Sequence, residues 1–211
     1  FVGSGLQDHP SVAFTLGLRE HAHHDAARLP IGTALHTYLG SDLMQLLPMS
    51  NLGPGPEATG LGSLMAALMT PTGHAGSVGI GHTGTPVIDF ALLEDPHDVD
   101  GLVAAAKLAI DLLDTPAFDE ITEQVYIDNQ GTTVETLSDS SSIREWVLGH
   151  CGDYVHATST CAMGTVVDED FMVKGYQNLY VCDASVFPSI PDANTHLPTT
   201  MVAERFGLRH G

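Results

Sequence analysis

The 211-residue chain is strongly acidic, with 7 lysine and arginine residues against 26 aspartate and glutamate residues and a formal net charge of -19. This excess of negative charge repels phosphate backbones and anionic lipid surfaces, so it argues against nucleic acid or a membrane surface as partner. No apolar run approaches the length of a membrane span. With 43% hydrophobic residues, the chain is long enough to bury the core of one domain or of two small ones.

The three cysteines, Cys151, Cys161 and Cys182, form no CxxC pair and are odd in number. They are typical of small buried hydrophobic residues or an incidental thiol rather than of a disulfide framework or a zinc site. We therefore expect a reducing, cytoplasmic compartment.

The first half of the chain carries short strand signals separated by glycine and proline turns. Apolar residues alternate from Val12 to Leu16 and again over residues 35–52, after which residues 51–60 indicate a loop. Further short apolar runs follow at residues 63–71, 76–81 and 85–96. Short strands with glycine turns predict an antiparallel sheet.

Three histidines, His21, His23 and His24, crowd into one short polar stretch. A metal site needs ligands that are fixed by more than one element, and this stretch offers a single loop. We expect exposed loop histidines and no metal site.

Two helices are predicted in the second half of the chain. The first begins at Asp95, an N-cap candidate followed by a proline, and its apolar residues recur at steps of three and four until Pro116. The second begins at Ser142, which is spaced to form a capping box with Glu145, and ends at Gly149. Strands and helices in separate stretches predict an α+β fold.

The last third contains a compact apolar run at residues 178–182, typical of a buried strand that ends at Asp183. Pro188 and Pro191 exclude one continuous element after it. A helix is predicted to begin at Pro198 and to continue through Phe206.

Two stretches of the last third together resemble a known family signature. Residues 156–164 read HATSTCAMG, and residues 175–205 read GYQNLYVCDASVFPSIPDANTHLPTTMVAER. They resemble the C-terminal signature of the glucose-methanol-choline (GMC) family of FAD-dependent oxidoreductases, approximately HPxGTCRMG and then GxxNLRVVDASVMPxxxxxNTNxPTxMIAE. Residues 2–10, VGSGLQDHP, resemble the family's VGxNLQDHP, and the similarity continues through residues 70–90 and 93–109.

The resemblance implies a division of the chain into two parts. Residues 1–150 would form a partial substrate-binding domain of antiparallel sheet and helices. Residues 151–211 would complete a Rossmann-like FAD-binding domain whose N-terminal half is absent from this chain, since no GxGxxG unit occurs in it. The implied partners are a small-molecule alcohol and that missing half, on the same or a separate chain, and the chain alone is expected to be inactive.

The resemblance also implies the roles of two histidines. Alcohol oxidation needs a base for the hydroxyl proton and a hydride acceptor, which is the flavin N5. His156 matches the family's first active-site histidine and is expected to be the base, a task that suits a neutral imidazole. His196 matches the second position and is expected to hydrogen-bond the substrate oxygen or to share the base role.

Contacts with FAD are implied for residues at matching motif positions: Val155, Asp183, Ala184, His196, Leu197, Pro198 and Thr199. The amides of Leu197, Thr199 and Thr200 at the predicted helix start would face the flavin edge where negative charge grows on reduction. 

The sequence departs from the family pattern at Ala157, Ser159 and Ala162, where the pattern has proline, glycine and arginine. These changes affect loop stiffness and a nearby charge rather than the histidine. Two alternatives to alcohol oxidation remain: a hydroxynitrile lyase on the same scaffold, which uses FAD structurally, and a non-catalytic acidic binding fragment.

Overall fold

The chain folds into two compact units, each assembled from separate stretches of sequence. The computed structural model describes residues 1–25, 27, 29–52, 60–73 and 75–211, so most of the loop predicted at 51–60 lies outside the described residues. The first unit comprises Phe1–Pro10, Met69–Asp98 and Asp153–Gly211, and the second comprises Ser11–Leu68 and Val99–Gly152.

This division differs from the predicted boundary between residues 150 and 151. The chain passes from the second unit to the first between residues 152 and 153, close to the predicted boundary. However, residues 1–10 and 69–98 belong to the same unit as residues 153–211. The reason is long-range backbone pairing within the first unit. Gln7 and Thr158 form an isolated antiparallel bridge, and Gly3 N–H donates to the Thr160 carbonyl at 2.8 Å.

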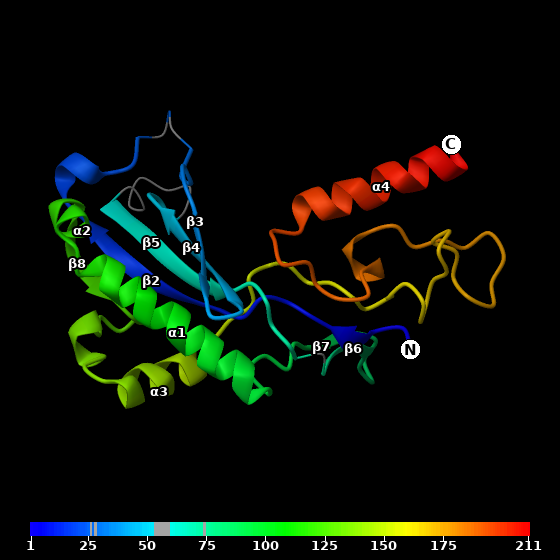
Figure 1. Cartoon of the computed structure of the whole chain (residues 1–211), viewed down its shortest axis with the longest axis horizontal. Helices are drawn as coiled ribbons and strands as arrows, with labels where there is room; N and C mark the ends of the chain where they lie inside the picture. Colours follow the sequence, from blue (N-terminus) through cyan, green and yellow to red (C-terminus); the bar gives the residue numbers. More distant parts are fainter. Residues whose placement is uncertain (26, 28, 53–59, 74) are drawn as a thin grey trace. The chain divides into compact units, whose positions relative to one another are not determined.

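The second unit is built on a five-stranded antiparallel sheet in the order β3-β4-β5-β2-β8 (Figure 1). Its strands are β2 Ser11–Leu18, β3 Leu35–Leu39, β4 Asp42–Met49, β5 Leu61–Leu68 and β8 Thr122–Tyr126. The antiparallel sheet and the α+β class are confirmed. The single strand run predicted over 35–52 is wrong, because Gly40, at φ 66°, turns the chain back between β3 and β4.

Helices pack on this sheet through close contacts. They are α1 Pro96–Leu113, α2 Pro116–Ile121 and α3 Ser140–His150, with short 3₁₀ turns at Glu20–Ala22 and Val134–Thr136. A Cβ atom on Gly101 of α1 would lie 2.9 Å from Cδ2 of Leu68 in β5, so any side chain there would require the Leu68 side chain to move. The ring of Trp146 in α3 lies 4.8 Å from that of Phe14 in β2, between ring centroids.

The caps of these helices confirm one prediction and correct another. The Asp95 carboxylate accepts the His97 amide at 2.9 Å at the start of α1, as predicted. The second helix begins at Ser140 rather than Ser142, and its capping box joins Asp139 to Ser142 instead of Ser142 to Glu145. A carboxylate directly before the helix accepts two amides, of Ser141 and Ser142, so it is the stronger cap.

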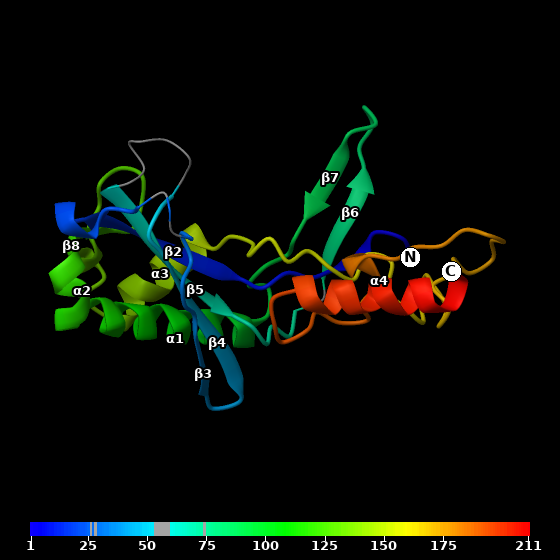
Figure 2. The ribbon, with the colours of Figure 1, turned by 90° about the horizontal axis from the view of Figure 1, so that it is seen from above.

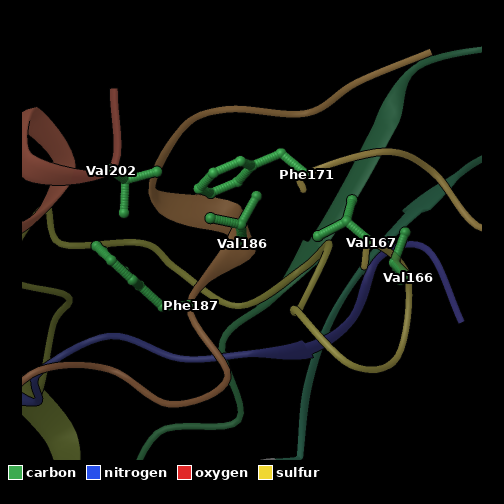
Figure 3. Close-up of a cluster of buried hydrophobic side chains, with 6 residues drawn as sticks. All are labelled: Val166, Val167, Phe171, Val186, Phe187 and Val202. Atoms are coloured by element: carbon green, nitrogen blue, oxygen red, sulfur yellow. The ribbon is translucent and has the colours of Figure 1, made fainter. Parts of the chain in front are cut away.

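The first unit holds a three-stranded sheet in the order β1-β6-β7, of which β6 and β7 form a hairpin (Figure 2). Its elements are β1 Ser4–Leu6, β6 Gly76–Ile80, β7 Pro86–Asp89, a 3₁₀ turn at Ala184–Val186, and α4 His196–His210. Buried side chains from α4, the 3₁₀ turn and the preceding loops form a core (Figure 3): Val166, Val167, Phe171, Val186, Phe187 and Val202. Among the described residues, no helix combines the length and the apolar character needed to cross a bilayer.

The predicted buried strand at residues 178–182 is wrong. This stretch pairs with residues 171–173 through two backbone hydrogen bonds and an isolated bridge between Met172 and Tyr180. Leu179 is 47% exposed, so the apolar run is not buried within the described residues. The helix predicted from Pro198 is confirmed, although α4 begins two residues earlier and ends at His210.

Candidate functional site

A buried carboxylate organises the loop that carries His156. Asp8 follows β1 and is 2% exposed. It accepts the amides of His9, Tyr154 and His156 at 2.7, 3.1 and 2.8 Å. Burial raises the pKa of Asp8 to about 6, while the three amide donors act in the opposite direction, so the carboxyl is ionised at neutral pH. Asp8 therefore holds the loop at residues 154–156 by hydrogen bonds against residues 8–9, which follow β1.

The residue between the two clamped amides has a strained backbone. Val155 has φ 61°, a left-handed conformation that is a clear outlier for a β-branched residue, and its side chain is 85% exposed. Such strain costs about 1–3 kcal/mol and persists only where surrounding contacts hold it. The two oxygens of Asp8 bind the amides on either side of Val155 and supply those contacts.

His156 forms a direct imidazole pair with His9. The two Nδ1 atoms lie 2.9 Å apart, and the rings are perpendicular, at 88°. His9 is fully buried, and its Nε2 lies 3.1 Å from the Pro191 carbonyl oxygen. Burial and then the neighbouring His156 lower the pKa of His9 to about 4, against the opposing effect of the Pro191 and Met69 carbonyls. Burial also lowers the pKa of the half-buried His156, so both rings are neutral at neutral pH.

The second nitrogen of His156 points to another segment of the first unit. Its Nε2 lies 3.4 Å from Nδ2 of Asn194, in the loop before α4. Tyr154 packs its ring edge against His156, with 4.8 Å between ring centroids. Burial raises the pKa of the Tyr154 hydroxyl to about 12, and this buried hydroxyl has no hydrogen-bond partner among the described residues.

Tyr154→Phe is expected to leave stability unchanged or to raise it by up to about 1 kcal/mol, because it removes a buried hydroxyl that makes no hydrogen bond. The thermal unfolding midpoint measures the effect. Tyr38→Phe, at a position that is 65% exposed, is the matched control and should be neutral. A clear loss of stability in Tyr154→Phe alone would show that the hydroxyl has a partner.

His196, the second predicted catalytic histidine, is exposed at the first residue of α4. Within the part of the chain that the structure describes, no hydrogen bond or ring contact joins its side chain to His156. The structure brings His9 to His156 instead, through a contact 147 positions apart in sequence. His9 lies in the LQDHP stretch, which resembles the family pattern. That resemblance indicated family membership but did not indicate a role for His9 beside His156.

The start of α4 differs from the predicted arrangement. Since the helix begins at His196, the Thr199 amide is already used, donating to the Thr195 carbonyl at 3.0 Å. Thr200 is likewise inside the helix, and Pro198 has no amide hydrogen. Of the predicted amide donors, only Leu197 lies in the part of the first turn that lacks intrahelical partners, and its side chain is 75% exposed.

Asp183 and Ala184 connect the two signature stretches. Asp183 caps the 3₁₀ turn by accepting the Ser185 amide at 2.8 Å, and the Ala184 carbonyl accepts the Ser159 amide at 3.4 Å. Ser159 has φ 75°, which explains why glycine is the family residue at this position. Its hydroxyl donates to Oε1 of Gln7 at 3.2 Å.

Asp8, His9 and His156 offer ligand atoms that all lie within 4.8 Å of one another, as a metal site would. The oxygens of Asp8 already accept three amides, and both nitrogens of His9 are in hydrogen bonds. We therefore interpret the group as a hydrogen-bonded cluster. 

The histidine stretch of the second unit lies beside an apolar cavity of about 920 Å³. His23 Nε2 contacts the Leu18 carbonyl oxygen at 3.2 Å, and His24 Nδ1 contacts Ser50 Oγ at 2.8 Å. Neither His156 nor His9 lines this cavity, so its size does not identify the candidate site.

The candidate site is therefore an imidazole pair, His9 and His156, whose loop is held by the buried carboxylate of Asp8. Sequence comparison names the family: the model of the GMC oxidoreductase family matches residues 71–203, more than half of the chain. The chain belongs to the GMC oxidoreductase family.

Individual relatives agree with this assignment. The chain is 28% identical to a 5-(hydroxymethyl)furfural oxidase from Methylovorus sp. (strain MP688), over 97% of the chain and 42% of that protein. It is 35% identical to an oxygen-dependent choline dehydrogenase from Vibrio vulnificus (strain YJ016), over 57% of the chain and 22% of that protein.

A solved structure of pyridoxine 4-oxidase from Mesorbium loti shares the fold, with a TM-score of 0.80 at 20% identity, covering 99% of this chain and 43% of that one. The chain thus spans less than half the length of these relatives.

Proposed function

We propose that this chain is the C-terminal part of an FAD-dependent oxidoreductase that oxidises an alcohol to a carbonyl compound, with His156 as the base. The observation that carries the proposal is the neutral, half-buried imidazole of His156, held on a clamped loop at a motif position of the family. FAD is the cofactor that the family assignment supports. The relatives named for 5-(hydroxymethyl)furfural and choline support a primary alcohol as substrate.

The residues present fit a flavin. The exposed apolar side chains of Val155 and Leu197 can pack against a planar ring, and the first amides of α4 can donate to a ring carbonyl. The residues that would hold FAD are Val155, Asp183, Ala184, His196, Leu197, Pro198 and Thr199. When bound, FAD supplies the hydride acceptor.

The chain's own residues would manage the substrate hydroxyl. His156 takes the proton from the alcohol oxygen, and His196 hydrogen-bonds that oxygen or shares the base role. We assign substrate binding to the sheet of the second unit and completion of the cofactor domain to the last sixty residues or so, as the resemblance implies. The remaining half of the enzyme, on the same or a separate chain, is the proposed partner, and this chain alone should be inactive.

The proposal is tested by mixing the complete flavoprotein anaerobically with 5-(hydroxymethyl)furfural, choline and benzyl alcohol. At least one alcohol should bleach the oxidised flavin and yield an aldehyde. A hydroxynitrile lyase would keep its flavin spectrum and would cleave mandelonitrile to benzaldehyde and cyanide. Material without flavin and without turnover would identify a non-catalytic acidic fragment.

The flavin-reduction rate should rise with pH on a limb whose midpoint lies below 6.5, the ordinary pKa of histidine. Burial lowers the pKa of His156, and only the neutral ring accepts a proton, so the active form is already complete near neutral pH. His9, with a pKa of about 4, and Tyr154, with a pKa of about 12, titrate outside this limb. Asp8, with a pKa of about 6, titrates on it, and its protonation at low pH weakens the clamp on the His156 loop, which lowers the rate in the same direction. Stopped-flow measurement across pH 5–9 checks this, and a midpoint above 6.5 would contradict it.

A further inference from the structure

We propose that His9 is a positioning residue that fixes the tautomer of His156, so that Nε2 of His156, rather than Nδ1, accepts the substrate proton. The inference rests on the proposed function of His156 and assigns it to one atom. It starts from the two hydrogen bonds of His9, a fully buried side chain for which the proposed mechanism has no other use.

The proton of the neutral His9 ring is on Nε2. Two carbonyls act on the His9 ring, those of Pro191 and Met69, and the effect of Pro191 is the larger. Nε2 of His9 lies 3.1 Å from the Pro191 carbonyl oxygen, which can only accept a hydrogen bond. Nε2 of His9 therefore carries the hydrogen. A neutral imidazole has a single N–H group, so Nδ1 of His9 is an acceptor.

The tautomer of His9 determines the tautomer of His156. The two Nδ1 atoms lie 2.9 Å apart, and two acceptors do not approach so closely without a hydrogen between them. Since His9 has none to offer, Nδ1 of His156 carries the hydrogen and donates it. The lone pair of His156 is then on Nε2, and the Asn194 amide, 3.4 Å away, offers its N–H to this same atom.

The positive charge formed during proton transfer resides on His156 and not on His9. Burial, and then His156, lowers the pKa of His9 to about 4, so His9 stays neutral while His156 becomes charged. The other titratable groups nearby are Asp8, whose oxygens are bound to backbone amides, the exposed Asp153, and Tyr154. Neither Asp8 nor Tyr154 is hydrogen-bonded to the His156 ring, so among the described residues His9 and Asn194 alone set its hydrogen pattern.

The proton balance is then complete. The alcohol O–H bond breaks, a new N–H bond forms at Nε2 of His156, and the hydrogen on Nδ1 stays in place. The resulting imidazolium keeps donating from Nδ1 to the lone pair of His9, which stabilises the charge. This is the task of a positioning residue behind a general base, and it places His9 outside contact with the substrate.

Neutron diffraction from crystals of the oxidised, substrate-free holoenzyme near pH 7 tests the tautomer directly. Deuterium is expected on Nε2 of His9 and on Nδ1 of His156, with none on Nε2 of His156. Deuterium on Nε2 of His156 would overturn the inference. The deuterium positions do not depend on turnover. The tautomer assignment can therefore be wrong while the proposed alcohol oxidation is right, and it can be right while the proposed oxidation is wrong.

Two variants of His9 separate positioning from simple packing. His9→Leu removes the acceptor, and His9→Asn keeps an oxygen acceptor near the position of Nδ1. We expect His9→Leu to lower the flavin-reduction rate about 10- to 100-fold, the range found for groups that orient metal-ligating histidines, with little change in KM. Its pH limb should move lower, because the charged ring loses its acceptor.

His9→Asn should recover a large part of the rate and of the pH limb. His82→Leu, at an exposed position in the β6–β7 hairpin, is the control and should match the parent enzyme. Equal losses in His9→Leu and His9→Asn with an unmoved pH limb would overturn the positioning role. If His9→Leu does not fold, the deuterium positions in the parent enzyme and the pH limb of His9→Asn test the positioning role.

Discussion

His156→Ala in the complete flavoenzyme is expected to lower the rate of alcohol-dependent flavin reduction by about a hundredfold or more, the usual contribution of a general base. The variant removes the group that we propose as the base for the hydroxyl proton. Flavin content should stay near that of the parent, because Asp8 binds the backbone amide of residue 156 and not its side chain. Anaerobic stopped-flow absorbance measures the rate, and the flavin spectrum measures cofactor content.

His82→Ala is the matched control, since it removes an exposed histidine from the same unit. His156→Gln, which keeps a hydrogen-bonding side chain but has no titratable nitrogen, should be as slow as His156→Ala. Turnover within a few-fold of the parent in either His156 variant would remove His156 from the role of base. His196 would then be the next residue to test.

Asp8→Ala is expected to cost about 3 kcal/mol or more in stability, because it leaves three amides without the acceptor that they have in the native structure. The loss has a second consequence. Without the clamp, Val155 can relax from its left-handed conformation and carry His156 away from His9. The thermal unfolding midpoint of the holoenzyme should fall by several degrees, and alcohol oxidation should fall with it.

Asp153→Ala is the matched control for Asp8→Ala. Asp153 is an exposed carboxylate of the same loop that accepts the Val155 amide at 3.2 Å, so its removal should cost well under 1 kcal/mol. Asp8→Asn should lie between the two, since it keeps one carbonyl oxygen. Equal unfolding midpoints for Asp8→Ala and Asp153→Ala would contradict the clamp.

Local sequence patterns predicted much of the fold and failed where two local signals competed. The alternation from Val12 to Leu16 and the three- and four-residue steps after Asp95 each had one plausible outcome, and β2 and α1 form there. The second helix cap was misassigned because Asp139 and Ser142 both suit an N-cap, and the earlier carboxylate has the better geometry. The apolar run at 178–182 satisfied a strand pattern, yet a strand also needs a partner in register, which periodicity does not reveal.

The sequence by itself determined the family, the α+β class and the candidacy of His156, because these depend on residue types at short spacings. Only the tertiary structure decided that His9 is the partner of His156, that Asp8 holds the strained turn at Val155, and that the start of α4 offers fewer amides than predicted. The physical reason is distance along the chain. A hydrogen bond between groups almost 150 residues apart forms only if the fold of the intervening chain brings them together. Local sequence patterns carry no information about that long-range arrangement.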